Sequence, residues 1–394
     1  MKATWTADGL RQFGQAVQRL MNQENLAYAE CYDLFCQVLR NEQPDLQQGA
    51  FLAALAGKGE TADEVAAAWQ AIDEIDTIHT QTLTGERLLE NSGTGMDALK
   101  TFNVSSAAAI VAAACGVRIA RHGARALTST CGTVDILEAV GVDMECELGV
   151  VEASIREVGI GVFNGMSAWV HPGALGRILS QIRFGSTLNL AASLANPARP
   201  TLGVRGVYDP ALIPVAHRVM LRAGYEAGLV VHGYNATRDK GMDEVSVCGA
   251  TQVFEFQANG ASTEYWIEPE AVGVKRWPYE PLRPCSTLAG EAVRFVQVLA
   301  GEGHEACVDF MCVNAAAILK VWGVTTSWQE GVALSRDAIR SGAARRRLQD
   351  WVTAQQAPDG DGGERYAAVS NRAGLERGWE ADGGSGARQQ VEEK

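Results

Sequence analysis

The chain has 394 residues, which is enough for two or three structural units of ordinary size. Hydrophobic residues make up 47% and charged residues 21%, so a chain that is mainly disordered or fibrous is excluded. The 34 basic and 47 acidic residues give a net charge of −13, which disfavours nonspecific binding to nucleic acid or to an anionic membrane. No apolar run approaches the roughly 20 residues that span a bilayer, and no signal peptide opens the chain. The nine cysteines include no CxxC pair, so we expect a cytoplasmic protein with reduced thiols.

The first eighty residues have the pattern of amphipathic helices. Apolar side chains recur at helical spacing between residues 10 and 20 and between residues 28 and 39. A third helix is expected after Pro44, and Thr61 with Glu64 forms a capping box for a fourth. We predict a helical domain over residues 1–82. Its broad apolar faces favour a homodimer contact, although packing within one core accounts for them about equally well.

From about residue 88, short strand-like runs alternate with alanine-rich helical runs. This alternation predicts an α/β domain over residues 83–355, with a mainly parallel central sheet flanked by helices. Residues 251–257 and 262–268 flank a turn and predict a β-hairpin. Residues 358–394 contain two glycine-rich acidic stretches and few large apolar residues, which predicts a disordered tail.

Two segments have the chemistry of a phosphate site. A glycine-rich turn at 92–97 precedes Asn103, Ser105 and Ser106 at the head of an alanine-rich helix, where free backbone amides and the helix dipole attract anions. A tight turn with an N-cap at Ser105 or Ser106 is the alternative. Farther along, the adjacent carboxylates of Asp243 and Glu244 suit Mg²⁺ bridged to substrate phosphates, or form a solvated helix start.

A third segment, Arg121-His-Gly-Ala-Arg125, places positive charge in an acidic chain, and 129–135 repeats the glycine-plus-hydroxyl pattern. Together these motifs resemble the anthranilate phosphoribosyltransferases, relatives of the pyrimidine nucleoside phosphorylases. That family reads GTGGD, TFNIST, KHGNR, SxKSGSxD, HPAM, NPAR, GVYDP, VHG and GLDE in one order. In the same order this chain has Gly93-Thr-Gly-Met-Asp97, Thr101-Phe-Asn-Val-Ser-Ser106, Arg121-His-Gly-Ala-Arg125, Ser129-Thr-Cys-Gly-Thr-Val-Asp135, His171-Pro-Gly-Ala, Asn196-Pro-Ala-Arg, Gly206-Val-Tyr-Asp-Pro, Val231-His-Gly and Gly241-Met-Asp-Glu244. The resemblance covers about residues 10–352.

The resemblance implies a fold, a reaction and a set of site residues. It implies a small helical domain, joined by a helical excursion near 171–195, and a larger α/β domain, with the active site between them and a homodimer through the helices. The reaction would move 5-phosphoribosyl from phosphoribosyl pyrophosphate (PRPP) to an aromatic acceptor, releasing pyrophosphate, with Mg²⁺. PRPP would be bound by Gly93, Thr94, Gly95, Asp97, Thr101, Asn103, Ser105, Ser106, Arg121 and Thr133. The acceptor would be bound by Gly93, His122, Ala124, His171 and Arg183, and the metal by Ser105, Asp243 and Glu244.

Several departures from the family pattern concentrate where substrates bind. Met96 replaces the second glycine of GTGGD, Ala124 replaces the asparagine of KHGNR, and Thr130 with Cys131 replaces a Lys-Ser pair. These changes favour an acceptor related to anthranilate over anthranilate itself, or weak or absent transfer. Neutral drift, with anthranilate still the acceptor, is the alternative. Because residues 131–139 are nearer to the phosphorylase loop pattern, a nucleoside phosphorylase-like enzyme is one alternative. A non-catalytic nucleotide-binding paralogue is another.

Overall fold

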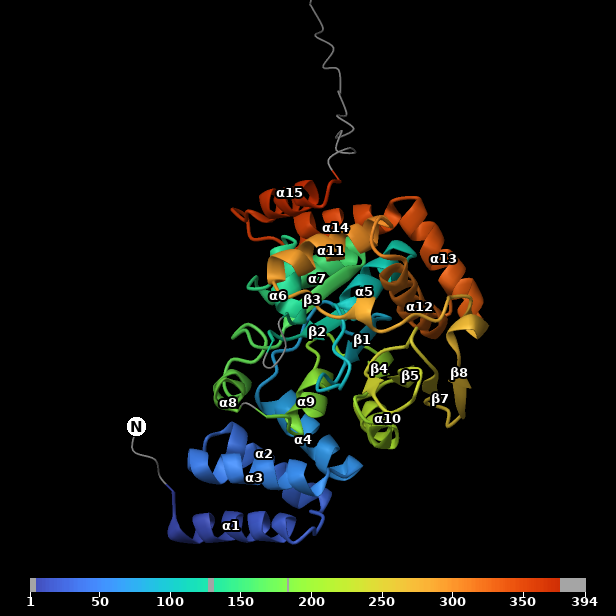
Figure 1. Cartoon of the computed structure of the whole chain (residues 1–394). Coiled ribbons are helices and arrows are strands. Elements are labelled where there is room, and N and C mark those ends of the chain that lie inside the picture. Colours follow the sequence, from blue (N-terminus) through green and yellow to red (C-terminus); the bar gives the residue numbers. More distant parts are fainter. Residues whose placement is uncertain (1–4, 127–130, 183, 376–394) are drawn as a thin grey trace, which may run out of the picture.

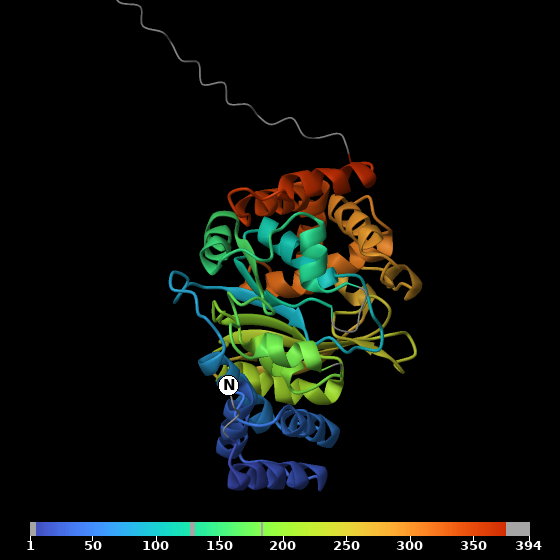
Figure 2. The same cartoon turned by 90° about the vertical axis from the view of Figure 1, so that its left-hand side faces the viewer.

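The computed structural model describes residues 5–126, 131–182 and 184–375. A small helical lobe lies on one side of a central sheet, and a thick helical layer covers the other side (Figures 1 and 2). The predicted fold class, a helical N-terminal part followed by an α/β part with a mostly parallel sheet, is confirmed. Within the described part of the chain, no helix is both long enough and apolar enough to cross a membrane.

The helical lobe contains the four helices predicted from the apolar spacing. The capping box forms as expected, with the Glu64 amide donating to Thr61 Oγ1 and the Glu64 carboxylate accepting from the Thr61 amide. Short helices from residues 175–194 pack on the same core, and the Trp69 indole donates to the Leu194 carbonyl at 3.1 Å. The lobe consists of α1 (Ala7–Met21), α2 (Tyr28–Leu39), α3 (Asp45–Lys58), α4 (Ala62–Ile75), α8 (Leu175–Gln181), α9 (Leu188–Ala191) and the 3₁₀ turn Ala192–Leu194.

The central sheet has the strand order β3-β2-β1-β4-β5-β7-β8, with the short strand β6 paired to β5. The first five strands are parallel, whereas β7 and β8 form the predicted antiparallel hairpin. Alternate residues of a strand face opposite layers. Thus Leu229 and Val231 join the core of the α/β domain, while Val230 packs on the core of the helical lobe. The strands are β1 (Leu89–Gly93), β2 (Ile119–Gly123), β3 (Ile160–Asn164), β4 (Leu202–Gly206), β5 (Ala227–Tyr234), β6 (Gly241–Met242), β7 (Thr251–Gln257) and β8 (Ser262–Ile267).

Helices on the far face of the sheet bury the largest core. Alanine-rich α5 is almost wholly buried there, since small side chains let neighbouring helices approach closely. Helix α10 (Ile213–Arg222) instead lies on the face toward the helical lobe. The far layer contains α5 (Val104–Ala114), α6 (Thr133–Ala139), α7 (Leu148–Val158), α11 (Leu288–Ala300), α12 (Glu305–Trp322), α13 (Trp328–Arg340), α14 (Ala343–Ala354) and α15 (Gly362–Arg372). Three further 3₁₀ turns span Pro210–Leu212, Pro269–Val272 and Glu280–Leu282.

The prediction of a disordered tail from residue 358 is wrong for its first part. Helix α15 packs on the α/β domain and buries Tyr366 and Val369, and Ala373 at its C-cap is buried on the same face. These few apolar residues lie three or four positions apart, so they share one helical face although the segment is poor in apolar residues. Residues 376–394 lie outside the described residues.

Candidate functional site

A cavity of about 330 Å³ opens at the carboxyl ends of the parallel strands, facing α8 and α9 of the helical lobe. Ligands of open α/β sheets bind at this edge. Its lining brings together residues from the motifs at 93–97, 101–106, 121–125, 129–135 and 241–244, Met96 and Cys131 among them. The motifs that begin at His171, Asn196, Gly206 and Val231 contribute no lining residue. The predicted site residues in the lining are Gly93, Thr94, Gly95, Asp97, Thr101, Asn103, Ser105, Ser106, Arg121, His122, Ala124, Thr133, Asp243 and Glu244.

The glycine-rich loop follows β1 and folds tightly against the carboxylates of a distant segment. The amide of Gly95, whose φ is +67°, donates to Asp243 Oδ2 at 2.7 Å. A Cβ added at Gly93 would overlap the Asp243 carboxylate, so this position has room only for glycine. The Thr94 amide donates to the Gly206 carbonyl, and Thr94 Oγ1 accepts from the Tyr208 amide, both at 3.1 Å. These contacts hold the loop at the edge of the cavity.

Helix α5 begins at the floor of the cavity, but its cap differs from the expected one. The N-cap is Asn103, whose side chain makes no capping bond, and the hydroxyls of Ser105 and Ser106 are used elsewhere. Ser105 Oγ donates to Glu244 Oε1 at 2.7 Å, while Ser106 Oγ accepts from Arg121 Nη1 at 2.7 Å. With no side chain covering the first turn, its amides and the positive end of the helix dipole stay available to an anionic ligand.

Arg121 on β2 is a buried cation beneath this helix start. Its Nε donates to the Asn91 carbonyl at 2.8 Å, and the side chain is almost wholly inaccessible to water. Burial lowers its pKa to about 10, against the opposing influence of Glu244 and Glu90, so the guanidinium stays charged near neutral pH. The predicted island of positive charge in an acidic protein therefore lies at the cavity floor.

Buried Asp243 and partly buried Glu244 form a pair of carboxylates between the glycine-rich loop and α5. Burial, together with the nearby charge of Asp97, raises the pKa of Asp243 to about 7. The pKa of Glu244 is raised by burial and by Asp243. Neighbouring protein groups thus neutralise these two negative charges only in part. A bound cation would stabilise both carboxylates in their ionised form.

The donor atoms around this pair suit a hard cation. Carboxylate and hydroxyl oxygens are the ligands that Mg²⁺ prefers, and Ser105 Oγ already lies against Glu244. Among the described residues, no group of three or more His, Cys, Asp or Glu side chains is arranged to hold a metal. A magnesium ion at this pair would therefore complete its coordination with ligand oxygens and water, as is usual where Mg²⁺ binds with a phosphate substrate.

Two buried histidines meet at the side of the cavity. His122 Nε2 lies 3.0 Å from Nε2 of His171, which comes from the segment before α8. A Cβ at Gly165 would lie 2.5 Å from His122 Nε2, so the glycine makes room for this ring pair. His171 itself is absent from the cavity lining. Ala124 lines the cavity with a methyl group, and Arg183 lies outside the described residues.

The departures from the family pattern fall in different parts of the site. Met96 has a left-handed backbone with φ +71°, and its thioether lies against the backbone of Gly185, which also lines the cavity. Cys131 lines the cavity as well, and burial raises the pKa of its thiol to about 12, so it is protonated near neutral pH. Thr130 lies outside the described residues.

A buried ion pair beneath the cavity was missed in the sequence analysis. Arg205 Nη2 lies 3.3 Å from Glu90 Oε2, and both side chains are inaccessible to water. Glu90 also accepts from the Tyr225 hydroxyl at 2.6 Å and from the His122 amide at 3.2 Å. Arg205 donates in turn to Ser193, a lining residue of the helical lobe. The available signal was one charged residue within each of two short strand-like runs, Glu90 after Leu89 and Arg205 after Val204.

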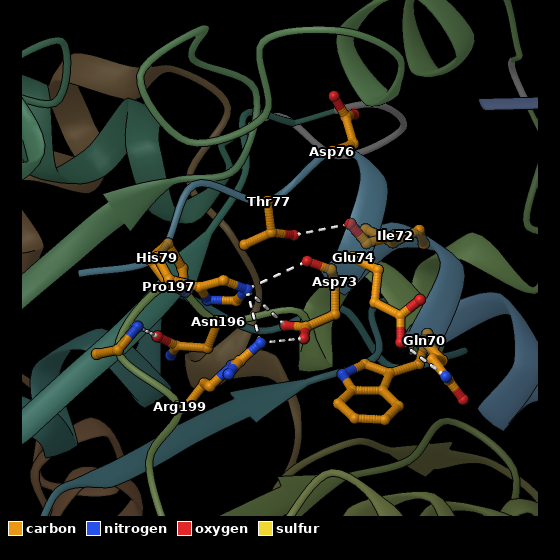
Figure 3. Close-up of polar contacts among 12 residues, drawn as sticks. Gln70, Ile72, Asp73, Glu74, Asp76, Thr77, His79, Asn196, Pro197 and Arg199 are labelled. Carbon is orange, nitrogen blue, oxygen red and sulfur yellow. Dashed lines mark hydrogen bonds and ion pairs between the residues drawn. The ribbon is translucent and has the colours of Figure 1, made fainter. Parts of the chain in front are cut away.

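The two lobes are joined where α4 ends. Figure 3 shows Asp73, His79 and Arg199 meeting beside Asn196, on segments that run between the helical lobe and the sheet. Arg199 Nη2 lies 2.7 Å from Asp73 Oδ2, and His79 Nε2 lies 3.1 Å from the Asp73 carbonyl (Figure 3). The Asp73 carboxylate, which lies 3.4 Å from His79 Nε2, raises the pKa of His79 above its ordinary value. This cluster fixes the lobe that carries α8 and α9 against the strand ends.

Comparison with known proteins matches both lobes to one family. Residues 85–345 match the model described as "Glycosyl transferase family, a/b domain", and residues 14–74 match the helical bundle domain of the same family. The chain is 32% identical to the anthranilate phosphoribosyltransferase of Methanothermobacter marburgensis, covering 86% of this chain and 97% of that protein. It is 35% identical to the enzyme of the same name from Anaeromyxobacter dehalogenans, covering 87% and 98%.

Solved structures agree with the sequence relatives. The anthranilate phosphoribosyltransferase (TrpD) of Thermus thermophilus superposes with a TM-score of 0.75 at 32% identity, covering 87% of this chain and 99% of that one. The Saccharomyces cerevisiae enzyme, solved in complex with PRPP and Mg, superposes with a TM-score of 0.74 at 22% identity, covering 87% and 98%. The resemblance inferred from the ordered motifs is confirmed.

Proposed function

The chain belongs to the glycosyl transferase family whose matched members are anthranilate phosphoribosyltransferases, and is thus a pentosyltransferase; we propose that it moves 5-phosphoribosyl from PRPP to an aromatic acceptor and releases pyrophosphate. The observation that supports this best is the convergence of three phosphate-binding features in one cavity. These are the glycine-rich loop, the uncovered start of α5 and the buried guanidinium of Arg121. The matched relatives favour this transferase over the phosphorylase and over a non-catalytic paralogue.

The residues act by binding and orientation rather than by covalent attack. Departure of pyrophosphate requires that its developing negative charge be stabilised. The free amides at the start of α5, together with Arg121, supply that stabilisation, and the glycine-rich loop shapes the edge of the cavity. We propose that Ser105, Asp243 and Glu244 hold Mg²⁺, which would supply further neutralisation of the phosphates. The acceptor nitrogen then needs only to be held in line with the ribosyl carbon.

We propose that the acceptor is an aromatic compound other than anthranilate. Ala124 presents a methyl group where the family pattern has an asparagine that both donates and accepts hydrogen bonds. Leu175, Leu179 and Phe184 line the cavity from the side of the helical lobe and provide an apolar wall for an aromatic ring. An anthranilate carboxylate would lose a polar partner in this pocket. A less polar ring substituent would not.

We also propose a homodimer through the helical lobe. Leu46 at the start of α3 is 89% exposed, and Met21 at the end of α1 is 63% exposed. These exposed apolar side chains lie on α1 and α3, which pack against each other in the helical lobe, and we infer that they belong to a contact between subunits. Light scattering at micromolar concentration is expected to give twice the chain mass. A Leu46→Glu variant should shift the population toward monomer, and a monomeric wild type would contradict the proposal.

Release of pyrophosphate tests the transferase activity. We expect release in the presence of PRPP, Mg²⁺ and an aromatic amine or hydroxybenzoate from a panel, and little release without an acceptor. An Arg121→Met variant should lose most of this activity, because the cavity floor loses its cation, whereas Arg276→Met removes a surface guanidinium and should not. Failure with every acceptor tested, at PRPP concentrations that saturate binding, would contradict catalysis of transfer.

A further inference from the structure

The buried histidine pair beside the cavity shares a single proton. His122 and His171 are 7% and 3% exposed, and their rings meet edge to face with Nε2 atoms 3.0 Å apart. At this distance one nitrogen must donate and the other must accept. The direction of that hydrogen bond sets which nitrogen of His122 carries a proton.

The end of helix α4 determines the direction. His171 Nδ1 lies 2.8 Å from the carbonyl oxygen of Asp76, which can only accept. The same nitrogen lies 3.3 Å from Thr77 Oγ1, but the Thr77 hydroxyl donates to the Ile72 carbonyl at 3.0 Å (Figure 3), so it too accepts from the ring. Both neighbours therefore require a proton on His171 Nδ1.

With His171 Nδ1 protonated and the ring neutral, the rest of the chain of hydrogen bonds follows. His171 Nε2 carries a lone pair, so His122 Nε2 must donate to it, and His122 Nδ1 is left with a lone pair. Burial lowers the pKa of both rings below the ordinary value, which keeps them neutral near pH 7. Among the described residues, His122 Nδ1 has no hydrogen-bond partner, and His122 lines the cavity.

The carboxylate of Asp76 holds this arrangement in place. It accepts hydrogen bonds from the amides of Gly173 and Leu175 at 2.6 and 2.7 Å and from the amide of Ala174 at 3.0 Å. The segment that carries His171 is therefore fastened to α4 by the side chain of Asp76 and by its carbonyl together. Figure 3 shows the Asp76 side chain directed away from the Asp73–His79–Arg199 cluster.

We propose that the Asp76 carbonyl, acting through His171 as a positioning residue, fixes His122 in the Nε2–H tautomer, so that Nδ1 accepts a hydrogen bond from the substrate. This inference rests on the proposed function and specifies its acceptor: an N–H or O–H of the aromatic compound faces His122. A carboxylate is disfavoured at the same position, because two sets of lone pairs would oppose one another. His122 thereby selects the nucleophilic group and orients it.

Nitrogen NMR of the uniformly ¹⁵N-labelled full-length protein tests the tautomer directly. The ¹⁵N signal of each ring nitrogen in the six histidines shows whether that nitrogen carries a proton. Near pH 7 we expect His122 to carry its proton on Nε2 and His171 on Nδ1. A proton on His122 Nδ1 would overturn the proposal. This measurement needs no substrate, so its outcome is independent of whether the protein binds PRPP.

A pair of variants connects the tautomer to acceptor choice. His171→Gln preserves the polarity, since its amide can donate to Asp76 and accept from His122, whereas His171→Leu cannot. We expect a single His122 tautomer in His171→Gln and a mixture in His171→Leu. His232, whose Nδ1 bonds the Val207 carbonyl at 2.7 Å, should be unchanged in both and serves as the control for folding.

Competitive inhibition of the transfer reaction connects the tautomer to function. In the presence of PRPP and Mg²⁺, an aromatic amine should bind about tenfold more tightly as an inhibitor than its N,N-dimethyl counterpart. A factor of about ten corresponds to one hydrogen bond to a buried partner. This preference should persist in His171→Gln and disappear in His171→Leu. An equal preference in both variants would contradict the positioning role. Absence of PRPP binding, measured separately by calorimetry, would instead contradict the proposed function and leave the tautomer result standing.

Discussion

Replacing Met96 with glycine is expected to tighten PRPP binding by about two- to tenfold. The Met96 thioether lies against Gly185 between the glycine-rich loop and the helical lobe, and both residues line the cavity. A ligand that fills this space must move the side chain, at a cost of about 0.5–1.5 kcal/mol if it leaves its preferred rotamer. The left-handed backbone of Met96 costs a non-glycine residue about 1–2 kcal/mol, and glycine costs about 0.5–1 kcal/mol in chain entropy. The free energy of unfolding should therefore rise by about 0–1.5 kcal/mol.

Gly185→Ala supplies the matched perturbation from the opposite side of the contact. Its Cβ would overlap the thioether of Met96, so the methionine must swing away, which is the same movement that we expect a ligand to require. Each single variant should raise PRPP affinity, and the double variant should add little more, because both remove one obstruction. Calorimetric titration of the four proteins with PRPP in excess Mg²⁺ measures this coupling. Additive gains, or weaker binding by Met96→Gly, would refute the account of this contact.

Three further outcomes are expected. Ala124→Asn should raise kcat/KM for anthranilate by about tenfold or more relative to other aromatic amines, because a buried polar partner contributes about 1–3 kcal/mol. If steady-state assays give an unchanged ratio of kcat/KM between anthranilate and the other amines, this position does not select the acceptor. Arg205→Met should lower the free energy of unfolding by about 3–5 kcal/mol in urea titrations, since it leaves Glu90 buried without its cation. A decrease in the free energy of unfolding of less than about 1 kcal/mol would contradict a buried ion pair. A chain that ends at Ala357 should melt at a lower temperature than one that ends at Leu375, because only the longer chain retains α15; equal melting temperatures would contradict the packing of that helix.

Features that depend on a few consecutive residues could be predicted from the sequence. The capping box at Thr61 and Glu64 needs only four consecutive residues, and the structure contains it as predicted. The glycine-rich loop and the start of α5 were likewise recognisable, because anion binding by backbone amides requires glycine and a helix start in succession. The order of the motifs along the chain then indicated the family resemblance, which implied an active site between the two domains.

The remaining features depend on partners far apart in the chain. His122 and His171 are 49 positions apart, and Glu90 and Arg205 are 115 apart, so their pairing follows from strand order and lobe packing. Helix α15 was missed because composition alone conceals the spacing of its few apolar residues. The hydroxyls of Ser105 and Ser106 also differ from the expected cap, since each bonds a charged side chain from another segment.

Magnesium-dependent PRPP binding is the most direct test of the proposed function. Calorimetric titration of the full-length protein with PRPP should give binding in the presence of Mg²⁺ and much weaker binding in the presence of a chelator. In a protein carrying both Asp243→Asn and Glu244→Gln, the difference between the two conditions should shrink, because the carboxylates that would hold the ion have been replaced by neutral amides. Absence of heat at millimolar PRPP with Mg²⁺ would contradict phosphoribosyl transfer, and equal affinity with and without Mg²⁺ would contradict the metal site.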